Sequence, residues 1–187
     1  MRELEEIDSR DRGDGTSHGT RLKQVPAETG RMLAILAASA PPGLCVEIGT
    51  SGGYSGLWLA MACRQSGRRM VTFEILPGKV SLAAETFGRA GVTDVVELVA
   101  GNAFDHLPGI GEIGFCFLDA EKEDYPGYYA MVVPKLVPGG ILTADNVISH
   151  AGVLGDFTRT ALDDPALDST VVPVGSGVLL CRKRETA

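Results

Sequence analysis

Apolar stretches of strand length alternate with helical patterns over most of the chain. Strands buried on both faces form continuous apolar runs, whereas helices space their apolar residues three or four positions apart. The sequence predicts strands at Leu44 to Ile48, Met70 to Ile75, Val95 to Val99, Ile113 to Leu118, Ile141 to Ala144, Thr170 to Val174 and Val178 to Cys181. It predicts helices from Pro26 and at Tyr54 to Arg64, Lys79 to Ala90, Tyr125 to Leu136 and Val153 to Leu162. This alternation indicates an α/β fold whose mostly parallel sheet has helices on both faces.

The end of the chain departs from this alternation. Only Gly175-Ser176-Gly177 separates the last two predicted strands, and a parallel crossover needs a dozen or more residues. We therefore expect an antiparallel last strand, paired as a hairpin with the strand before it. The sequence shows no internal repeat and no linker, so residues 23–187 are predicted to form one domain.

Residues 1–22 carry no comparable apolar period. They include the polar, glycine-rich run Arg10-Asp11-Arg12-Gly13-Asp14-Gly15. Polar chain ends are typically mobile unless a partner orders them. The sequence predicts a flexible N-terminal segment and leaves open whether it is a lid or an untidy terminus.

Composition and charge narrow the class of partner. The 187 residues are 44% hydrophobic and 22% charged, with 24 glycines and 10 prolines, a globular composition with many turns. The formal net charge of −7 argues against nucleic acid, because phosphate-binding surfaces need clustered Lys and Arg. No apolar run reaches the roughly 20 residues of a membrane span, and the N-terminus lacks a signal-peptide core. We expect a cytoplasmic protein that acts on a small molecule.

Four cysteines favour free thiols. They lack CxxC spacing, and three of them lie in predicted strands. Disulfides and a zinc site are the alternatives, although structural zinc ligands usually have short spacings. We expect unpaired, buried side chains for Cys45, Cys63, Cys116 and Cys181.

The first predicted strand ends in a glycine-rich turn, Val46-Glu47-Ile48-Gly49-Thr50-Ser51-Gly52-Gly53-Tyr54-Ser55. Ligands of parallel sheets bind at the carboxyl ends of strands, where glycine permits close approach and free helix amides favour a carboxylate. A dinucleotide motif GxGxxG would place glycines where Ser51 and Tyr54 stand. An acid followed by Gly49 and Gly53 instead resembles motif I of class I methyltransferases. An ordinary glycine-rich turn remains the alternative.

An acid also ends the second predicted strand, Val71-Thr72-Phe73-Glu74-Ile75. A carboxylate about 20 residues after such a turn can accept both hydroxyls of a ribose. This spacing occurs with NAD and with S-adenosylmethionine, so Glu74 indicates a ribose without selecting the cofactor. A solvated strand-end glutamate is the alternative.

Two later strands also end in polar residues. Asp119 follows Phe117-Leu118, and Asp145-Asn146 follow Thr143-Ala144. Carboxylate and amide oxygens are hard ligands that suit Mg²⁺, Mn²⁺ or Ca²⁺, with water and substrate completing the coordination. The pattern predicts a metal site at one sheet edge, and helix capping by the same acids is the alternative.

With these motifs, residues 22–183 resemble the cation-dependent O-methyltransferases, which include catechol and caffeoyl-CoA O-methyltransferases. The resemblance implies a Rossmann-like class I methyltransferase fold, S-adenosylmethionine as cofactor, and often a homodimer. The most similar stretches are Val25-Pro26-Ala27-Glu28-Thr29-Gly30, Glu47 to Ser55, Leu118-Asp119-Ala120-Glu121-Lys122-Glu123-Asp124-Tyr125, Pro138-Gly139-Gly140 and Asp145-Asn146.

The resemblance also implies a role for individual residues. Asp119, Asp145 and Asn146 match the metal ligands, with Mg²⁺ the expected ion and Mn²⁺ or Ca²⁺ the alternatives. Asp119 would also contact the amino group of the cofactor, and Glu74 would bind its ribose. Positions around the methionine moiety are matched by Val25, Glu47, Gly49 and Ser55, and Thr50 of the same turn is also expected to bind the cofactor. Positions that enclose the adenine are matched by Ile75, Ala103 and Phe104.

Lys122 matches the general base of the family. A nearby divalent cation would disfavour the ammonium and lower the pKa of Lys122, so that the neutral amine could take a hydroxyl proton. A surface lysine in a charged turn is the alternative. The histidines His18, His106 and His150 carry no expected role, and His150 is expected to be a loop residue.

The expected reaction is an in-line methyl transfer, with the sulfonium methyl about 3 Å from a metal-bound hydroxyl oxygen of the acceptor. Two adjacent hydroxyls would chelate the metal, so the family suggests a catechol-like or phenolic substrate. Residues 173–177, however, offer no acid for a second hydroxyl. Three alternatives remain: a metal-independent methyltransferase, a nucleotide-dependent oxidoreductase, and a non-catalytic cofactor-binding protein.

Overall fold

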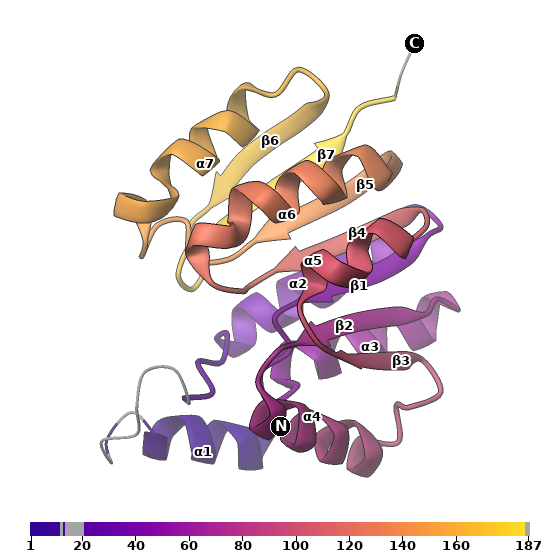
Figure 1. The fold of residues 1–187 in the computed structure, drawn as a ribbon, viewed down its shortest axis with the longest axis vertical. Helices are drawn as coiled ribbons and strands as arrows, with labels where there is room; N and C mark the ends of the chain where they lie inside the picture. The colour runs from indigo at the N-terminus through magenta and orange to yellow at the C-terminus, as the bar shows by residue number, and fades with distance from the viewer. Residues whose placement is uncertain (12, 14–20, 186–187) are drawn as a thin grey trace.

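The computed structural model describes residues 1–11, 13 and 21–185, whose strands form one seven-stranded sheet in the order β3-β2-β1-β4-β5-β7-β6 (Figure 1). Six strands run parallel, and β7 is antiparallel to both of its neighbours. The strands are β1 (Leu44–Ile48), β2 (Met70–Glu74), β3 (Val96–Ala100), β4 (Ile113–Leu118), β5 (Leu136–Ala144), β6 (Leu167–Val172) and β7 (Val178–Lys183). The predicted sheet and its antiparallel last strand are confirmed.

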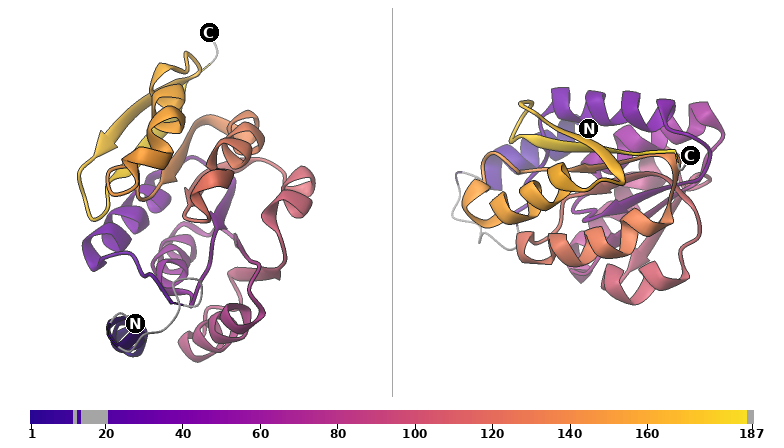
Figure 2. Two further views of the ribbon diagram at one scale, coloured as in Figure 1. Left: turned by 60° about the vertical axis from the view of Figure 1, so that its left-hand side comes forward. Right: turned by 90° about the horizontal axis from the view of Figure 1, so that it is seen from above.

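Helices cover both faces of this sheet, as the view from above shows (Figure 2). One face carries α2 (Ala27–Ser39), α3 (Tyr54–Ser66) and α4 (Pro77–Ala90), and α1 (Arg2–Asp11) joins their apolar cluster through Leu4. The opposite face carries α5 (Ala103–His106), α6 (Tyr125–Val132) and α7 (Ala151–Asp163). Short 3₁₀ turns lie at η1 (Leu107–Gly109), η2 (Lys122–Asp124) and η3 (Val133–Lys135).

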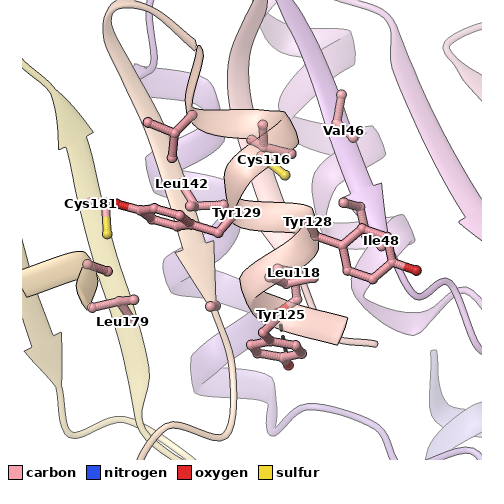
Figure 3. Packing of buried hydrophobic residues seen from close by; sticks show 14 of the residues in the cluster. Val46, Ile48, Cys116, Leu118, Tyr125, Tyr128, Tyr129, Leu142, Leu179 and Cys181 are labelled. Atoms are coloured by element: carbon pink, nitrogen blue, oxygen red, sulfur yellow. Dashed lines mark hydrogen bonds between the residues drawn. The ribbon is translucent and has the colours of Figure 1, made fainter. Parts of the chain in front are cut away.

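The core of the second face is rich in aromatic residues. Tyr125, Tyr128 and Tyr129 of α6 pack over the strands, as the close view shows (Figure 3). Phe157 of α7 meets Tyr125 and Tyr129 edge to face, with ring centroids 5.5 and 5.8 Å apart. This packing fixes α6 over β4, directly beside the end of the strand that precedes Asp119.

Two strands begin before their predicted starts, β5 at Leu136 rather than Ile141 and β6 at Leu167 rather than Thr170. Two predicted ends were wrong for local reasons. Helix α6 ends at Val132 instead of Leu136, because Pro134 cannot supply the amide that a continuing helix needs. The chain turns through η3, and Leu136 instead begins β5. Strand β6 ends at Val172, two residues before the predicted end, where Pro173 has no amide for the ladder.

The N-terminal segment, for which the sequence showed no apolar period, contains a helix that packs on the core. Arg2–Asp11 forms helix α1, in which Leu4 is buried and Ile7 packs against the core. Glu5 Oε1 accepts a 2.7 Å hydrogen bond from the Tyr54 hydroxyl. Residues 12 and 14–20, which include His18, lie outside the described residues. The flexibility of residues 1–22 and the domain boundary at residue 23 stay predictions.

The structure also bears on the cysteines and on membrane-spanning segments. All four cysteines are free and buried, as expected for core thiols. In the part of the chain that the structure describes, no helix is long and apolar enough to cross a membrane.

Candidate functional site

The sheet reverses its strand order between β1 and β4, and the predicted site residues gather at the carboxyl edge there. Backbone pairing continues one residue past the strands: Asp119 N donates to Ile48 O at 2.9 Å, and Asp145 N donates to Leu118 O at 3.0 Å. The two aspartates therefore follow adjacent parallel strands, β4 and β5, as the sequence predicted.

The glycine turn packs directly against this acidic edge. Gly49 has a φ of 100°, and a Cβ atom placed there would lie only 2.1 Å from the carbonyl oxygen of Asp119. A side chain at this position is therefore excluded by sterics as well as by backbone conformation. Gly49 N and Thr50 N both lie 3.1 Å from Phe73 O, which ties the turn to β2.

Glu74 ends β2 in a cradle of backbone donors. Its Oε2 accepts from Ser51 N at 2.8 Å, and its Oε1 accepts from Leu76 N at 2.9 Å. The side chain is only 7% exposed. Each carboxylate oxygen retains a second lone pair, so the group can still accept hydrogen bonds from a diol.

Glu47 is fully buried in β1. Its Oε2 accepts a 2.6 Å hydrogen bond from the Thr72 hydroxyl, whereas its Oε1 has no partner among the described residues. Burial raises the pKa of Glu47 to about 7, although the hydroxyls of Thr72 and Ser55 favour the ionised form. The turn is therefore built over a carboxylate that titrates near neutral pH.

Lys122 lies against Asp119 at the start of η2. Its Nζ donates to Asp119 Oδ1, to Ala120 O and to the Tyr125 hydroxyl at 2.9, 2.9 and 3.0 Å. Both side chains of the ion pair are less than one-fifth exposed. The alternative of a solvated surface lysine is not what the structure shows, because three acceptors hold the ammonium at the site.

Asp145 is 3% exposed, and its Oδ1 has no hydrogen-bond partner in the described structure. Burial, reinforced by the charge of Asp119, raises the pKa of Asp145 to about 7. The next residue, Asn146, adopts a left-handed backbone with a φ of 68°. Two close acids with an orphaned buried oxygen form a site that a cation would satisfy.

The residues present fit a hard divalent cation. Within residues 1–11, 13 and 21–185, no three His, Cys, Asp or Glu side chains gather as a metal site. The predicted set differs from such a cluster because its third protein ligand is an amide, and its remaining positions are for water and substrate. The unpartnered Asp145 Oδ1 is the atom that supports this fit.

The three residues expected around the adenine differ in exposure and in packing. Ile75 is 61% exposed directly after Glu74, and Ala103 is buried at the start of α5. The ring of Phe104, however, stacks on Tyr128 with centroids 4.1 Å apart, so it faces α6. Its backbone amide donates to Asn102 Oδ1 at 3.0 Å. Phe104 therefore shapes this region through its backbone and its packing on α6.

The remaining predicted positions line the turn or lie apart from it. Val25 is 6% exposed in the apolar cluster shared with α2 and α3, and Ser55 is 8% exposed in the first turn of α3. His106 stacks on Phe73 with centroids 5.9 Å apart. His150 lies in the exposed loop after Asn146, where its Nδ1 is 2.9 Å from Ser149 Oγ.

Sequence reasoning missed three polar residues at the site: Thr72, Asn102 and Tyr125. The role of Asn102 could have been predicted from the sequence, because asparagine between a strand and a helix is a preferred N-cap residue. Thr72 lies inside an apolar strand, and Tyr125 stands at the junction of a charged turn and a predicted helix. Only the strand register and the packing of α6 bring their hydroxyls to the site.

Comparisons with known proteins identify the family of this chain. Residues 12–184 match the family model described as O-methyltransferase. A catechol O-methyltransferase of Mycobacterium tuberculosis strain H37Rv is 37% identical over 161 residues, which are 79% of this chain and 73% of the relative.

Solved structures show the same fold with the cofactor or its product bound. The Streptomyces achromogenes O-methyltransferase TomG in complex with SAM is 30% identical, with a TM-score of 0.81 over 97% of this chain and 89% of TomG. The Bacillus cereus O-methyltransferase in complex with SAH is 25% identical, with a TM-score of 0.80 over 98% and 91% of the two chains. The chain belongs to the O-methyltransferase family and is an S-adenosylmethionine-dependent O-methyltransferase of the class I fold.

Proposed function

We propose that this O-methyltransferase methylates a hydroxyl of a catechol-like or phenolic small molecule with the help of a divalent cation, Mg²⁺ in the first instance. The main support for this proposal is the pair Asp119 and Asp145, because the buried Asp145 Oδ1 has no hydrogen-bond partner among the described residues. The name of the M. tuberculosis relative, catechol O-methyltransferase, supports the acceptor class.

Asp119, Asp145 and Asn146 would hold the cation, which when bound supplies a Lewis acid that favours the ionised hydroxyl of the acceptor. Lys122 would accept the hydroxyl proton on the lone pair of its neutral amine, while its two N–H groups stay on two of the three neighbouring oxygens of Asp119, Ala120 and Tyr125. The resulting ammonium would pair with the Asp119 carboxylate. Because these three acceptors fix Nζ, the base is oriented before the acceptor arrives.

The cofactor would occupy the neighbouring half of the edge. Glu74 would accept the ribose hydroxyls, and the turn with Glu47, Gly49, Thr50 and Ser55 would receive the methionine end beside Val25. Ile75, Ala103 and Phe104 would bound the adenine, and Asp119 would accept from the cofactor's amino group. Glu74 supports this assignment, because its two backbone donors aim the carboxylate before any ligand binds.

The test is a methyl-transfer screen over catechol, single phenols and aliphatic alcohols, with Mg²⁺, with Mn²⁺ and with excess EDTA. The proposal expects catechols to be the best acceptors and EDTA to abolish turnover. Full turnover in EDTA would instead establish a metal-independent methyltransferase. Turnover only of alcohols that lack a neighbouring hydroxyl would remove the catechol assignment.

We also infer that the chain acts as a homodimer, an expectation that follows from its family resemblance. Light scattering on the full chain measures its mass directly. A mass equal to that of a single 19.7 kDa chain at micromolar concentration would refute the inference.

A further inference from the structure

The buried carboxylate of Glu47 is connected to the glycine turn by two threonine hydroxyls. Thr72 Oγ1 donates to Glu47 Oε2 at 2.6 Å, and Thr50 Oγ1 lies 2.5 Å from Thr72 Oγ1. A hydroxyl has one proton to give, and Thr72 gives it to the carboxylate, so Thr50 is the donor to Thr72. The hydrogen bonds therefore run in one direction, from Thr50 through Thr72 to Glu47.

This hydroxyl relay, consisting of Thr50, Thr72 and Glu47, is closed to water. Thr72 and Glu47 are 0% exposed, and Thr50 is 1% exposed. Glu47 and Thr72 are register partners on β1 and β2, which places both side chains on one face of the sheet. A hydrogen bond to a charged group in such a dry environment is stronger than the same bond at a surface.

The relay joins two parts of the proposed cofactor site. The turn is already tied to β2 through Phe73 O and through the bond from Ser51 N to Glu74 Oε2. The relay adds a side-chain tie between the same two segments, at Thr50 and Thr72. Strand β2 therefore carries the proposed ribose carboxylate and also anchors the turn expected to receive the methionine end.

We propose that Thr72 is a positioning residue of the methyltransferase: through Thr50 and Glu47 it fixes the glycine turn relative to the Glu74 carboxylate, and so sets cofactor affinity without touching the cofactor. This inference rests on the cofactor site proposed above. Neither the family resemblance nor the sequence pattern singled out Thr72, which lies in an apolar strand.

The pH dependence of cofactor affinity separates a positioning role of Thr72 from a purely structural one, because it depends on the ionisation of Glu47. The Glu47 pKa of about 7 reflects burial, against which the Thr72 hydroxyl favours the ionised carboxylate. Protonation weakens the acceptor at the end of the relay, so cofactor affinity should rise with pH through about 7. The titratable groups whose charges interact with Glu47 are Cys45 on its own strand, Cys63 on α3, Cys116 on β4, and Glu74 and Asp119 at strand ends.

The experiment is calorimetric titration of S-adenosylhomocysteine into the full chain between pH 6 and pH 8.5. Thr72→Val should weaken binding roughly tenfold at pH 8, because it removes a hydrogen bond to a charged group. It should also shift the midpoint of the affinity profile to higher pH. Thr72→Ser keeps the donor and should restore both affinity and midpoint.

Thr143→Val is the matched control. Thr143 is also fully buried, on β5, and its hydroxyl donates to Cys116 O at 3.2 Å. This substitution should lower the thermal midpoint of unfolding comparably and leave the S-adenosylhomocysteine profile unchanged. If Thr72→Val does not fold, Thr72→Ala removes the same hydroxyl without placing a second methyl group in the strand and should give the same pH shift.

The outcomes separate this inference from the cofactor site on which it rests. A wild-type chain that binds no S-adenosylhomocysteine overturns both. If the wild type binds and Glu74→Ala binds more weakly, while Thr72→Val or Thr72→Ala keeps wild-type affinity and pH midpoint, the positioning role of Thr72 alone is wrong.

Discussion

The two halves of the carboxyl edge of the sheet differ in the hydrogen-bond partners of their acidic side chains. In the cofactor half, at the ends of β1 and β2, Glu74 and Glu47 accept hydrogen bonds from backbone amides and a threonine hydroxyl. In the acceptor half, at the ends of β4 and β5, Asp119 pairs with Lys122, whereas Asp145 Oδ1 has no described partner. In the cofactor half, three of the four carboxylate oxygens accept hydrogen bonds from the chain, and Glu47 Oε1 has no partner among the described residues. The acceptor half holds acids that a cation would complete. Binding and chemistry should therefore respond to different substitutions.

The largest effect should come from Asp145→Ala. Loss of this proposed metal ligand should lower turnover of a catechol about 10³-fold, since a bound cation would contribute several kcal/mol to the transition state. Affinity for S-adenosylhomocysteine should stay within about threefold, because the cofactor half is intact. Asp119→Ala should reduce both, since this residue is assigned to both halves. Wild-type turnover by Asp145→Ala, together with activity in excess EDTA, would make these acids structural caps.

Glu47→Gln should increase stability at high pH. The folded chain raises the pKa of Glu47 from 4.5 to about 7, so the native state binds this proton more tightly than the unfolded state does. The contribution of the protonated group is fully present below pH 4.5 and is lost as pH rises to about 7. Urea unfolding should show Glu47→Gln more stable than wild type by roughly 3 kcal/mol at pH 8 and nearly equal at pH 4.5. An identical stability difference at both pH values would refute the buried titration.

Lys122→Met should reduce turnover about 10²-fold, the typical contribution of a general base. Metal affinity and S-adenosylhomocysteine affinity, both measured by calorimetry, should change little. Lys135→Met is the matched control, because Lys135 bonds only the carbonyl oxygens of Pro108 and Ile110 in the described structure. Equal turnover by the two variants would exclude a catalytic role for Lys122.

Glu74→Ala should act in the cofactor half alone. Binding of S-adenosylhomocysteine should weaken by roughly 1–3 kcal/mol, because Ser51 N, Leu76 N and the ribose hydroxyls lose their acceptor. Turnover at saturating S-adenosylmethionine should fall much less than for Asp145→Ala. Unchanged affinity by calorimetry would remove Glu74 from the site.

Removal of residues 1–22 should lower stability and leave the fold intact. Leu4 and Leu22 pack on the cluster beside the glycine turn, and losing this burial should lower stability by roughly 1–3 kcal/mol. The seven-stranded sheet contains none of these residues, so thermal unfolding should stay cooperative. A truncated chain without a cooperative transition would make this segment part of the core.

The two halves also differ in how far the sequence predicts them. Asp119, Asp145 and Glu74 could be placed because each ends an apolar run, and parallel strands end at the same sheet edge. The Thr50 to Glu47 relay could not be placed, because it depends on the register that pairs Glu47 with Thr72. Nothing within an apolar strand marks which threonine will meet a buried acid.

The N-terminal helix shows another limit of sequence reasoning. Leu4 and Ile7 are the only aliphatic residues of α1, too few to indicate an amphipathic helix against eight polar neighbours. Their burial depends on Leu57 and Leu82, which lie far along the chain on α3 and α4. Tertiary packing, rather than local pattern, decides the conformation of this segment.

The antiparallel insertion of β7 has a consequence for folding during synthesis. Strands β1 to β4 pair with one another and can assemble once β4 has left the ribosome. Strand β5, which carries Asp145 at its end, pairs on its far side with β7, so that edge stays open until the last strand emerges. An open apolar edge is a site of aggregation. We therefore expect nascent chains stalled before Val178 to be the most aggregation-prone intermediates, with the acceptor half the last part of the site to form.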